Sequence, residues 1–301
     1  MAPAWTEIAL IAPVGWLELV AETLSLGPCS SVAFGRPSLA TPEPPAGFEW
    51  VRAYVIEDDD TPALRAQVEA AVGGLAELTG AEELRGLAVR FRRLPAEDYA
   101  TSWRKSWKPL RVADFAIVPR DFAGALRPTD RRLVLEPGGA FGTGRHPTTR
   151  GCLRALSRLV RPGDRVLDAG CGSGILAVGA ALCGARAALG FDIDPTAMPY
   201  ARELALWNGV VERCEFRAGT FECLGPADTG FDGVLANIFA DLIQAHAEDM
   251  AARLRPGGWF AFSGCLDKKR YPTVAAIEEA GLVLDTLHTR GQWDTFVGHK
   301  P

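Results

Sequence analysis

The sequence lacks the features that mark membrane, exported and repetitive proteins. Its 301 residues contain no apolar run long enough to cross a bilayer. No basic N-terminal stretch precedes an uninterrupted apolar segment, as it would in a secretory signal peptide. There is also no internal repeat and no low-complexity tract. We therefore expect a cytoplasmic protein that does not associate with membranes.

Patterns typical of metal sites, disulfide frameworks and hydrolase triads are missing as well. The seven cysteines are odd in number, widely scattered and without a CxxC pair or a histidine at ligand spacing. We expect no metal and interpret the cysteines as buried free thiols. The four histidines are dispersed, and no Ser-His-Asp set is evident. Only His146 lies beside a glycine-rich motif, where either a role facing the substrate or a role in loop structure is possible.

Negative charge is concentrated in the first third of the chain. Residues 1–95 contain thirteen Asp and Glu against seven Arg and no Lys, a net charge of −6. The remaining residues have a net charge of +1. An acidic module repels phosphate backbones and attracts a basic protein. The alternative is an acidic surface that only faces solvent.

The length and an apolar content of 48% allow two domains with separate cores. In residues 1–95, strand patterns cover residues 6–12, 31–34, 48–56 and 87–94, and helical spacing covers residues 15–26 and 62–78. The resulting order β-α-β-β-α-β is that of an α+β, ferredoxin-like domain. We predict this smaller domain for the N-terminal end.

Residues 96–110 predict a helix that links this domain to a second one. Trp103 and Trp107 lie one helical turn apart, and two indoles on one face indicate packing on a neighbouring domain. Beyond the linker, residues 111–118 and 132–135 predict a pair of strands.

The rest of the chain predicts an α/β domain over residues 111–301. From Arg150 onward, strand and helix patterns alternate, and an antiparallel pair at residues 282–287 and 292–298 closes the series. This alternation is typical of a mostly parallel sheet with helices on both faces.

The strongest motif is RVLDAGCGSG at residues 165–174, followed by an apolar helical run. A strand ends at Asp168, and Gly170, Gly172 and Gly174 turn the chain into a helix. Positions without side chains let backbone N–H groups approach a ligand, and the helix N-terminus attracts its negative end. We therefore predict Gly170 and Gly172 as cofactor-binding residues. A tight strand–helix turn without a ligand is the alternative interpretation.

Three details favour S-adenosylmethionine over a nicotinamide dinucleotide. The spacing is GxGxG rather than GxGxxG, and the acidic Asp168 comes directly before the turn. A second strand at residues 187–191 ends in Asp192, where a carboxylate can bind both ribose hydroxyls. The sequence thus predicts a methyltransferase.

Asn237 is the candidate catalytic residue. It follows the apolar strand in FDGVLANIFA, residues 231–240, at the end where ligand chemistry occurs in parallel sheets. Methyl transfer needs a neutral nucleophile aligned with the breaking C–S bond, so an amine must first lose a proton. The side-chain oxygen or backbone carbonyl of Asn237 could orient that amine. Alternatively, Asn237 caps the helix that begins near Asp241.

Longer motifs identify a family resemblance. LEPGGAFGTGRHPTTR at residues 135–150, WRKSWKPLRV at 103–112 and ANIFADL at 236–242 closely resemble the bacterial ribosomal protein L11 methyltransferases, the PrmA family. The FGTGxHPTT string is far more specific than the glycine loop. The N-terminal region agrees with the family in architecture but not in any sharp motif.

The resemblance implies a Rossmann-like, seven-stranded class I methyltransferase domain that uses S-adenosyl-L-methionine and releases S-adenosyl-L-homocysteine. It implies N-methylation of lysine side chains and the N-terminal amine of ribosomal protein L11, free or before full ribosome assembly, with the N-terminal domain recognising this substrate. It further implies cofactor contacts from Thr149, Gly170, Asp192 and Asn237, and a lid at residues 142–144. Pro199 is a departure, where the family helix usually runs uninterrupted.

Three other functions remain open at this point. One is methylation of lysines on another basic protein. Another is adenine methylation of RNA or DNA, but such enzymes usually place Pro-Pro-aromatic after the asparagine so that a flipped base can stack. Here Ile238 and Phe239 follow Asn237 and no basic stripe precedes it, so we expect no direct nucleic-acid substrate. A binding module with a residual cofactor fold is disfavoured by the intact glycine loop and Asp192.

Overall fold

The computed structural model describes residues 5–25, 31–34, 43–56, 59–94, 109–135, 144 and 146–301. The chain divides into two compact units, with the main boundary after residue 107. The predicted linker helix at 96–110 lies almost entirely outside the described residues. The predicted domain limits 1–95 and 111–301 therefore stay predictions.

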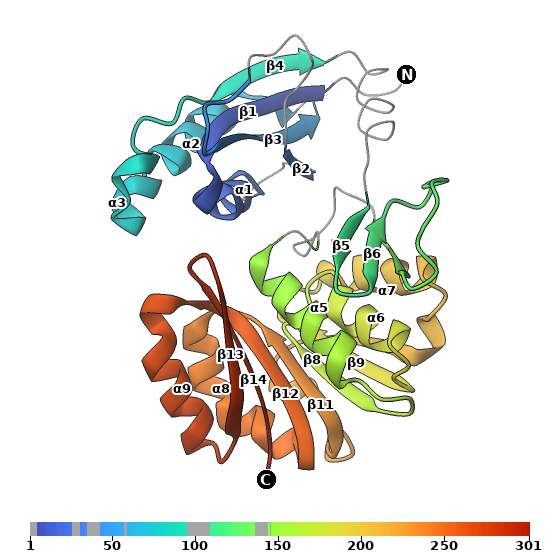
Figure 1. Cartoon of the computed structure of the whole chain (residues 1–301). Coiled ribbons are helices and arrows are strands. Elements are labelled where there is room, and N and C mark those ends of the chain that lie inside the picture. Colours follow the sequence, from blue (N-terminus) through green and yellow to red (C-terminus); the bar gives the residue numbers. More distant parts are fainter. Residues whose placement is uncertain are drawn as a thin grey trace. The chain divides into compact units, whose positions relative to one another are not determined.

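The N-terminal unit is built on a four-stranded antiparallel sheet in the order β2-β3-β1-β4. Its strands are β1 (Trp5–Pro13), β2 (Ser31–Phe34), β3 (Phe48–Ile56) and β4 (Arg90–Leu94). Helices α1 (Leu17–Ser25) and α2 (Pro62–Gly73) cover one face (Figure 1), where alternate residues such as Ile8 and Leu10 are buried. The predicted β-α-β-β-α-β order is confirmed.

Two boundaries in this unit differ from the prediction. The helix expected at residues 62–78 is interrupted at Gly74, after which α3 (Leu75–Thr79) forms a separate short helix. Glycine has a low helix propensity, which explains the break. The strand expected from residue 87 begins only at Arg90, because a turn with Gly86 at φ +74° precedes it.

The C-terminal unit contains a seven-stranded sheet in the order β10-β9-β8-β11-β12-β14-β13. Its strands are β8 (Arg165–Ala169), β9 (Ala187–Asp192), β10 (Cys214–Ala218), β11 (Phe231–Asn237), β12 (Leu254–Leu266), β13 (Val283–Arg290) and β14 (Trp293–His299). The first five in spatial order are parallel, and β14 is antiparallel to both of its neighbours. The predicted fold class, including the closing antiparallel pair, is confirmed.

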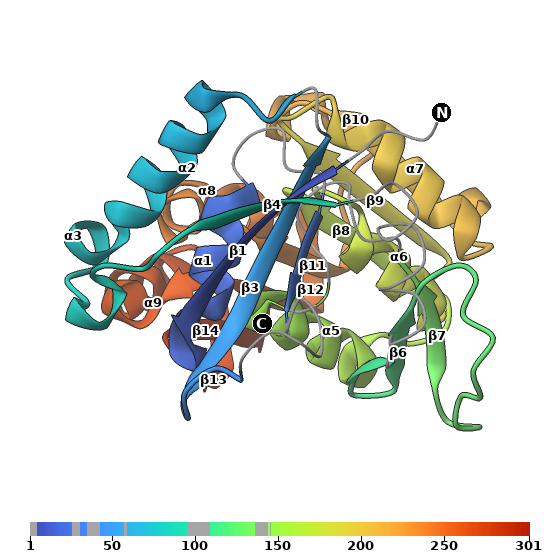
Figure 2. The same ribbon diagram turned by 90° about the horizontal axis from the view of Figure 1, so that it is seen from above.

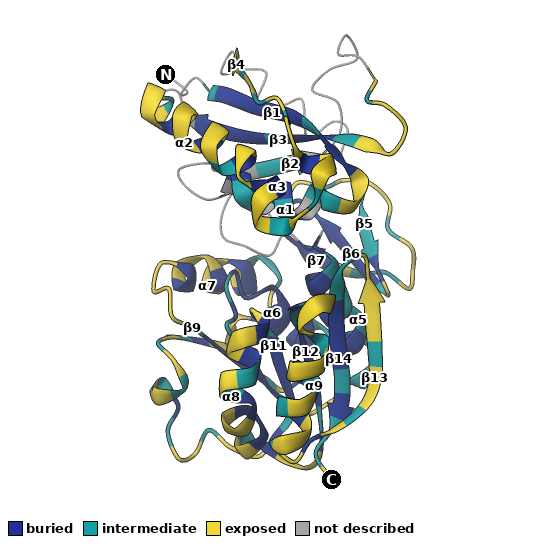
Figure 3. Ribbon diagram, turned by 90° about the vertical axis from the view of Figure 1, so that its left-hand side faces the viewer, coloured by how far each residue is buried: buried dark blue, intermediate teal, exposed yellow. Residues whose placement is uncertain are grey.

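Helices cover both faces of this sheet (Figures 1 and 2). One face packs against α5 (Pro147–Leu159), α6 (Ile175–Leu182) and α7 (Ala197–Trp207), and the other against α8 (Ala240–Arg253) and α9 (Arg270–Glu279). Figure 3 shows the central strands buried between helices whose outer surfaces are exposed, whereas the edge strand β13 is largely exposed. Pro199 lies in the first turn of α7, where a backbone N–H has no partner within the helix, and α7 continues through it.

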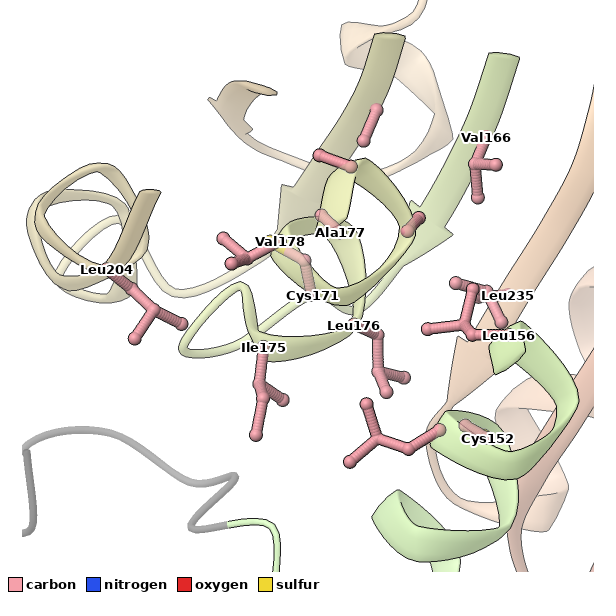
Figure 4. Packing of buried hydrophobic residues seen from close by; sticks show 14 of the residues in the cluster. Cys152, Leu156, Val166, Cys171, Ile175, Leu176, Ala177, Val178, Leu204 and Leu235 are labelled. Atoms are coloured by element: carbon pink, nitrogen blue, oxygen red, sulfur yellow. The ribbon is translucent and has the colours of Figure 1, made fainter. Parts of the chain in front are cut away.

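The core beneath α5 and α6 is closely packed. In Figure 4, Cys152 and Leu156 of α5 and Leu176 of α6 point toward one another beside Leu235 of β11. Burying a large aliphatic side chain of this kind stabilises a fold by roughly 1.5–3 kcal/mol. The six described cysteines are free thiols, and three are buried: Cys152, Cys171 and Cys265. No helix in the described ranges combines the length and apolar character needed to span a membrane.

The segment before α5 forms a small sheet of its own. Where a pair of strands is predicted, the structure has three: β5 (Leu110–Val112), β6 (Phe115–Val118) and β7 (Arg131–Val134). The predicted single strand at 111–118 is wrong because Ala113 adopts φ +51° and reverses the chain without a glycine. Phe115 and Leu133 are buried in the same core as α5 and α6.

The packing of β11 against β12 predicts that Gly233→Ala destabilises the C-terminal unit. A Cβ at Gly233 would lie 2.1 Å from Cζ2 of Trp259, so the indole would have to move. Overpacking of this kind costs about 1–3 kcal/mol. Calorimetric unfolding should show a lower Tm. Gly73→Ala is the matched control, because its Cβ meets nothing within 4 Å; a Gly233→Ala Tm equal to that of the wild type would contradict the prediction.

Candidate functional site

The strand register brings the predicted site residues into one row. Ala169, the last residue of β8, pairs with Phe191 in β9 and with Ala236 in β11. The next residues along the chain are Gly170, Asp192 and Asn237, so these three lie side by side at the carboxyl edge of the sheet. The helices that follow β8 and β11 lie on opposite faces, which opens a crevice between these two strands.

The glycine loop adopts backbone conformations that other residues disfavour. Gly170, Gly172 and Gly174 have φ of +70°, +48° and +78°, in the left-handed region. The Gly170 N–H donates to the Phe191 carbonyl at 2.9 Å, which ties the loop to the end of β9. A Cβ at Gly170 would lie 2.3 Å from Cγ2 of Ile238. The loop therefore leaves Gly170 and Gly172 half-buried at the sheet edge and packs closely on its β11 side.

Asp192 is oriented by two backbone donors. Its Oδ2 accepts from the Gly172 N–H at 2.8 Å, and its Oδ1 accepts from the Asp194 N–H at 3.0 Å. Each carboxylate oxygen can accept a second hydrogen bond. Fixed in this way beside the glycine loop, the carboxylate can accept from two neighbouring hydroxyls, as the predicted ribose contact requires.

Asn237 contacts Thr149 across the crevice. Its Nδ2 donates to Thr149 Oγ1 at 3.2 Å, and Thr149 is fully buried in α5. The alternative role of Asn237 as a helix cap is wrong: the N-cap of α8 is Phe239, and this cap has no side-chain hydrogen bond. Nδ2 thus donates to Thr149, and Oδ1, the acceptor atom of the amide, can accept an N–H from a substrate.

Asp168 is buried beneath the glycine loop. Its Oδ2 accepts from the Ala177 N–H at 3.0 Å, and its Oδ1 has no hydrogen-bond partner among the described residues. Burial, and secondarily the nearby charge of Asp192, raises the pKa of Asp168 to about 7. The position of Asp168 near the strand end was predicted, but its burial was not. The signal was an acid inside the otherwise apolar VLDA run.

His146 has a structural role, as one of the two possibilities for this residue expected. It is the N-cap of α5, where its Nδ1 accepts from the Thr148 N–H at 3.3 Å. Its ring packs edge-on against Trp293 with centroids 4.8 Å apart. Burial lowers the pKa of His146 to about 4, so the ring is neutral at physiological pH. The signal was Pro147, since proline at the first helical position indicates a cap just before it.

The predicted lid falls mostly outside the described residues. Of residues 142–144, the structure describes Gly144. Its φ is +72°, and a Cβ added there would lie 2.3 Å from Ile117 Cδ1, so this position has no room for a side chain. The linker tryptophans Trp103 and Trp107 also lie outside the described residues.

The residues of the crevice fit the sulfonium nucleoside that the motif predicts. Asp192 presents oriented carboxylate oxygens at the crevice, beside a glycine loop with left-handed backbone conformations. The carboxylate of Asp192 at the edge suits a ligand that carries positive charge. The binding roles of Thr149, Gly170, Gly172, Asp192 and Asn237 stay predictions, but the structure brings all five together.

Comparison with known proteins gives a consistent result over nearly the whole chain. The model of the family described as ribosomal protein L11 methyltransferase (PrmA) matches residues 4–301. A ribosomal protein L11 methyltransferase of Geobacter sulfurreducens is 37% identical over 303 residues, covering 99% of this chain and 98% of the relative. One from Chloroflexus aurantiacus is 35% identical over 330 residues, with the same coverage of 99% and 98%.

A solved structure agrees with these relatives. The ribosomal protein L11 methylase of Lactobacillus delbrueckii subsp. bulgaricus is 27% identical and superposes with a TM-score of 0.58, covering 65% of this chain and 100% of that one. The family match and the two relatives each span almost all of the sequence. The chain therefore belongs to the ribosomal protein L11 methyltransferase (PrmA) family of class I methyltransferases that depend on S-adenosylmethionine.

Proposed function

We propose that this protein transfers methyl groups from S-adenosyl-L-methionine to ribosomal protein L11, the substrate for which its family is named. The finer proposal is that lysine side chains and the N-terminal amine are methylated, on L11 that is free or not yet fully assembled into the ribosome. The observation that carries the proposal is the row of Asp192, Gly170 and Asn237 at one sheet edge, with Asn237 hydrogen-bonded to Thr149. Since ribosomal proteins are made in the cytoplasm, we place the reaction there.

The cofactor-binding residues divide into two groups by chemistry. Gly170 and Gly172 present peptide groups without side chains, and Asp192 offers oxygens to the ribose hydroxyls. Thr149 and Asn237 close the other side of the crevice. When bound, the cofactor supplies a methyl carbon made electrophilic by its sulfonium. The carboxylate of Asp192 is engaged by the N–H groups of Gly172 and Asp194, and the attacking atom is the nitrogen of the substrate amine.

Asn237 would orient the substrate amine. An ammonium has no lone pair with which to attack, so the nitrogen must be neutral when it meets the methyl carbon. Oδ1 of Asn237 can accept one N–H of that neutral amine and direct its lone pair toward the crevice.

The N-terminal unit would recognise L11. Residues 1–95 carry a net charge of −6, and a basic partner such as an RNA-binding ribosomal protein is attracted to an acidic surface. The same charge repels nucleic-acid backbones, which supports a protein rather than an RNA substrate.

The direct test is methylation of purified L11 with labelled S-adenosylmethionine. We expect label on L11, with mass spectrometry locating it on lysines and the N-terminal amine, and Asn237→Ala should lower kcat by about 100-fold because the amine is no longer aligned. A ribosome-depleted lysate provides the comparison. Label on another protein, with none on purified L11, would refute the proposed substrate; label on RNA would favour the nucleic-acid alternative.

A fragment beginning at residue 96 separates recognition from chemistry. It should bind S-adenosylhomocysteine like the full chain and methylate L11 far more slowly. Equal rates for the fragment and the full chain would exclude a recognition role for the N-terminal unit.

The ribose contact predicts that Asp192→Ala weakens cofactor binding. Two hydrogen bonds to a charged acceptor would be lost, each worth about 1.5–3 kcal/mol, so the Kd for S-adenosylhomocysteine should rise by about 100-fold or more. Isothermal titration calorimetry measures this directly. Asp194→Asn, at an exposed position two residues further along, is the control and should leave the Kd within about two-fold. An unchanged Kd for Asp192→Ala would remove the ribose assignment.

The buried carboxyl of Asp168 predicts a pH-dependent stability. Its pKa is raised from 3.8 to about 7 in the folded state, so between these values the folded state binds more protons than the unfolded state. The stability of the wild type should therefore fall as pH rises through this window, and the loss should persist above about pH 7. Asp168→Asn stays neutral and can still accept from the Ala177 N–H.

Thermal unfolding without cofactor checks this expectation. At about pH 8 the Tm of Asp168→Asn should exceed that of the wild type, and the difference should vanish near pH 4. A difference that is the same at both pH values would show that ionisation of Asp168 does not affect stability.

A further inference from the structure

Ile238, the residue that follows Asn237, is packed between Gly170 and Gly264. We infer that Gly264, in a bulge of β12, is a positioning residue that holds Asn237 in place for methyl transfer through the Ile238 peptide. This inference rests on the proposed function, because it concerns how the Asn237 amide is oriented toward the substrate amine.

Gly264 lies directly beneath the backbone that follows Asn237. Asn237 pairs with Ser263 in β12, and the pairing of β12 with β14 shifts between Ser263 and Cys265, which marks a bulge. Gly264 in this bulge has φ +94°, and a Cβ there would lie 2.1 Å from the carbonyl oxygen of Ile238 and 2.7 Å from its carbonyl carbon. The carbonyl group of Ile238 can approach β12 this closely only because Gly264 has no side chain.

The side chain of Ile238 is held on the opposite side. Its Cγ2 lies 2.3 Å from the position of a Cβ on Gly170, and the Ile238 N–H donates to the Ser263 carbonyl at 3.1 Å. Helix α8 begins only at Ala240. The residue after Asn237 is therefore fixed by the glycine loop and the β12 bulge, before the helix starts.

The same strands support the hydrogen-bond partner of Asn237. Ser263 Oγ donates to the Asp294 carbonyl at 2.8 Å and lies 2.9 Å from Thr295 Oγ1, and all three residues are buried. A Cβ on Gly151 would lie 2.1 Å from Thr295 Oγ1, so α5 approaches β14 closely two residues after Thr149. Asn237 thus pairs with β12, and the helix that carries Thr149 packs against β14. These two strands support both partners of the hydrogen bond.

A side chain at position 264 would move Asn237 away from Asp192 and the glycine loop. The Ile238 carbonyl would be pushed off β12 and would carry Asn237 with it, whereas Asp192 and Gly172 sit on the far side of Gly170. In-line transfer loses on the order of 100-fold in rate for a displacement of about 1 Å. Gly264→Ala should therefore lower kcat and leave cofactor affinity intact.

The experiment compares Gly264→Ala with Gly281→Ala. Gly281 also has a positive φ, +77°, but a Cβ there meets nothing within 4 Å, and it lies between α9 and β13 away from the crevice. Both variants incur the same kind of backbone strain. We expect kcat for L11 to fall about 10- to 100-fold in Gly264→Ala alone, with the Kd for S-adenosylhomocysteine within about two-fold of the wild type in both.

A structural readout accompanies the kinetics. The side-chain amide signals of Asn237, assigned in ¹⁵N spectra by comparison with Asn237→Asp, should shift in Gly264→Ala and stay in place in Gly281→Ala. Should Gly264→Ala not fold, Ile238→Ala and Ile238→Val decide the matter. Valine keeps the Cγ2 that rests on Gly170, and alanine removes it, so kcat should fall in the alanine variant only.

The outcomes separate this inference from the proposed function. Unchanged kcat and unchanged Asn237 signals in Gly264→Ala, or equal rates in the two Ile238 variants, would overturn the positioning role. A wild-type protein that leaves L11 unmethylated would instead refute the proposed substrate, and the Asn237 signals would still decide on positioning.

Discussion

The site depends on how closely the end of β8 approaches the chain that follows β11, and this approach is possible because Gly170 has no side chain. Ile238 occupies the space that a Cβ would take, with 2.3 Å between its Cγ2 and that position. The contact brings Asn237 within the same row as Asp192, one strand to either side of Gly170. A larger residue at 170 would therefore separate the Asp192 carboxylate, proposed to bind the cofactor, from the Asn237 amide, proposed to orient the substrate.

Electrostatics in the crevice follow from what is buried and what is held by backbone donors. Asp192 accepts two N–H groups and stays at the rim, whereas Asp168 is enclosed and has its pKa raised to about 7. His146, the nearest imidazole in sequence to the cofactor motifs, is neutral because burial lowers its pKa to about 4. The charge that Asp192 brings to this edge is negative, which suits a cofactor with a sulfonium and an α-ammonium group.

Motifs in the sequence predicted the parts of this arrangement that come from local backbone geometry. The glycine spacing and the strand-end positions of Asp192 and Asn237 followed from residue order alone, because parallel strands expose their carboxyl ends at one edge. The Asn237–Thr149 hydrogen bond joins residues 88 apart and came only from the fold. The turn at Ala113 was missed because no glycine or proline marks it, and the bulge at Gly264 because a lone strand glycine has several explanations.

An uncharged amide at position 237 suits the reaction better than a carboxylate would. A carboxylate at hydrogen-bond distance stabilises the ammonium form and raises the pKa of a lysine, which removes the lone pair needed for attack. The amide oxygen accepts an N–H of the neutral amine without that penalty, and the hydrogen bond from its Nδ2 to Thr149 determines which end faces the crevice. Asp192 thus lies on one side of Gly170 and the uncharged amide of Asn237 on the other.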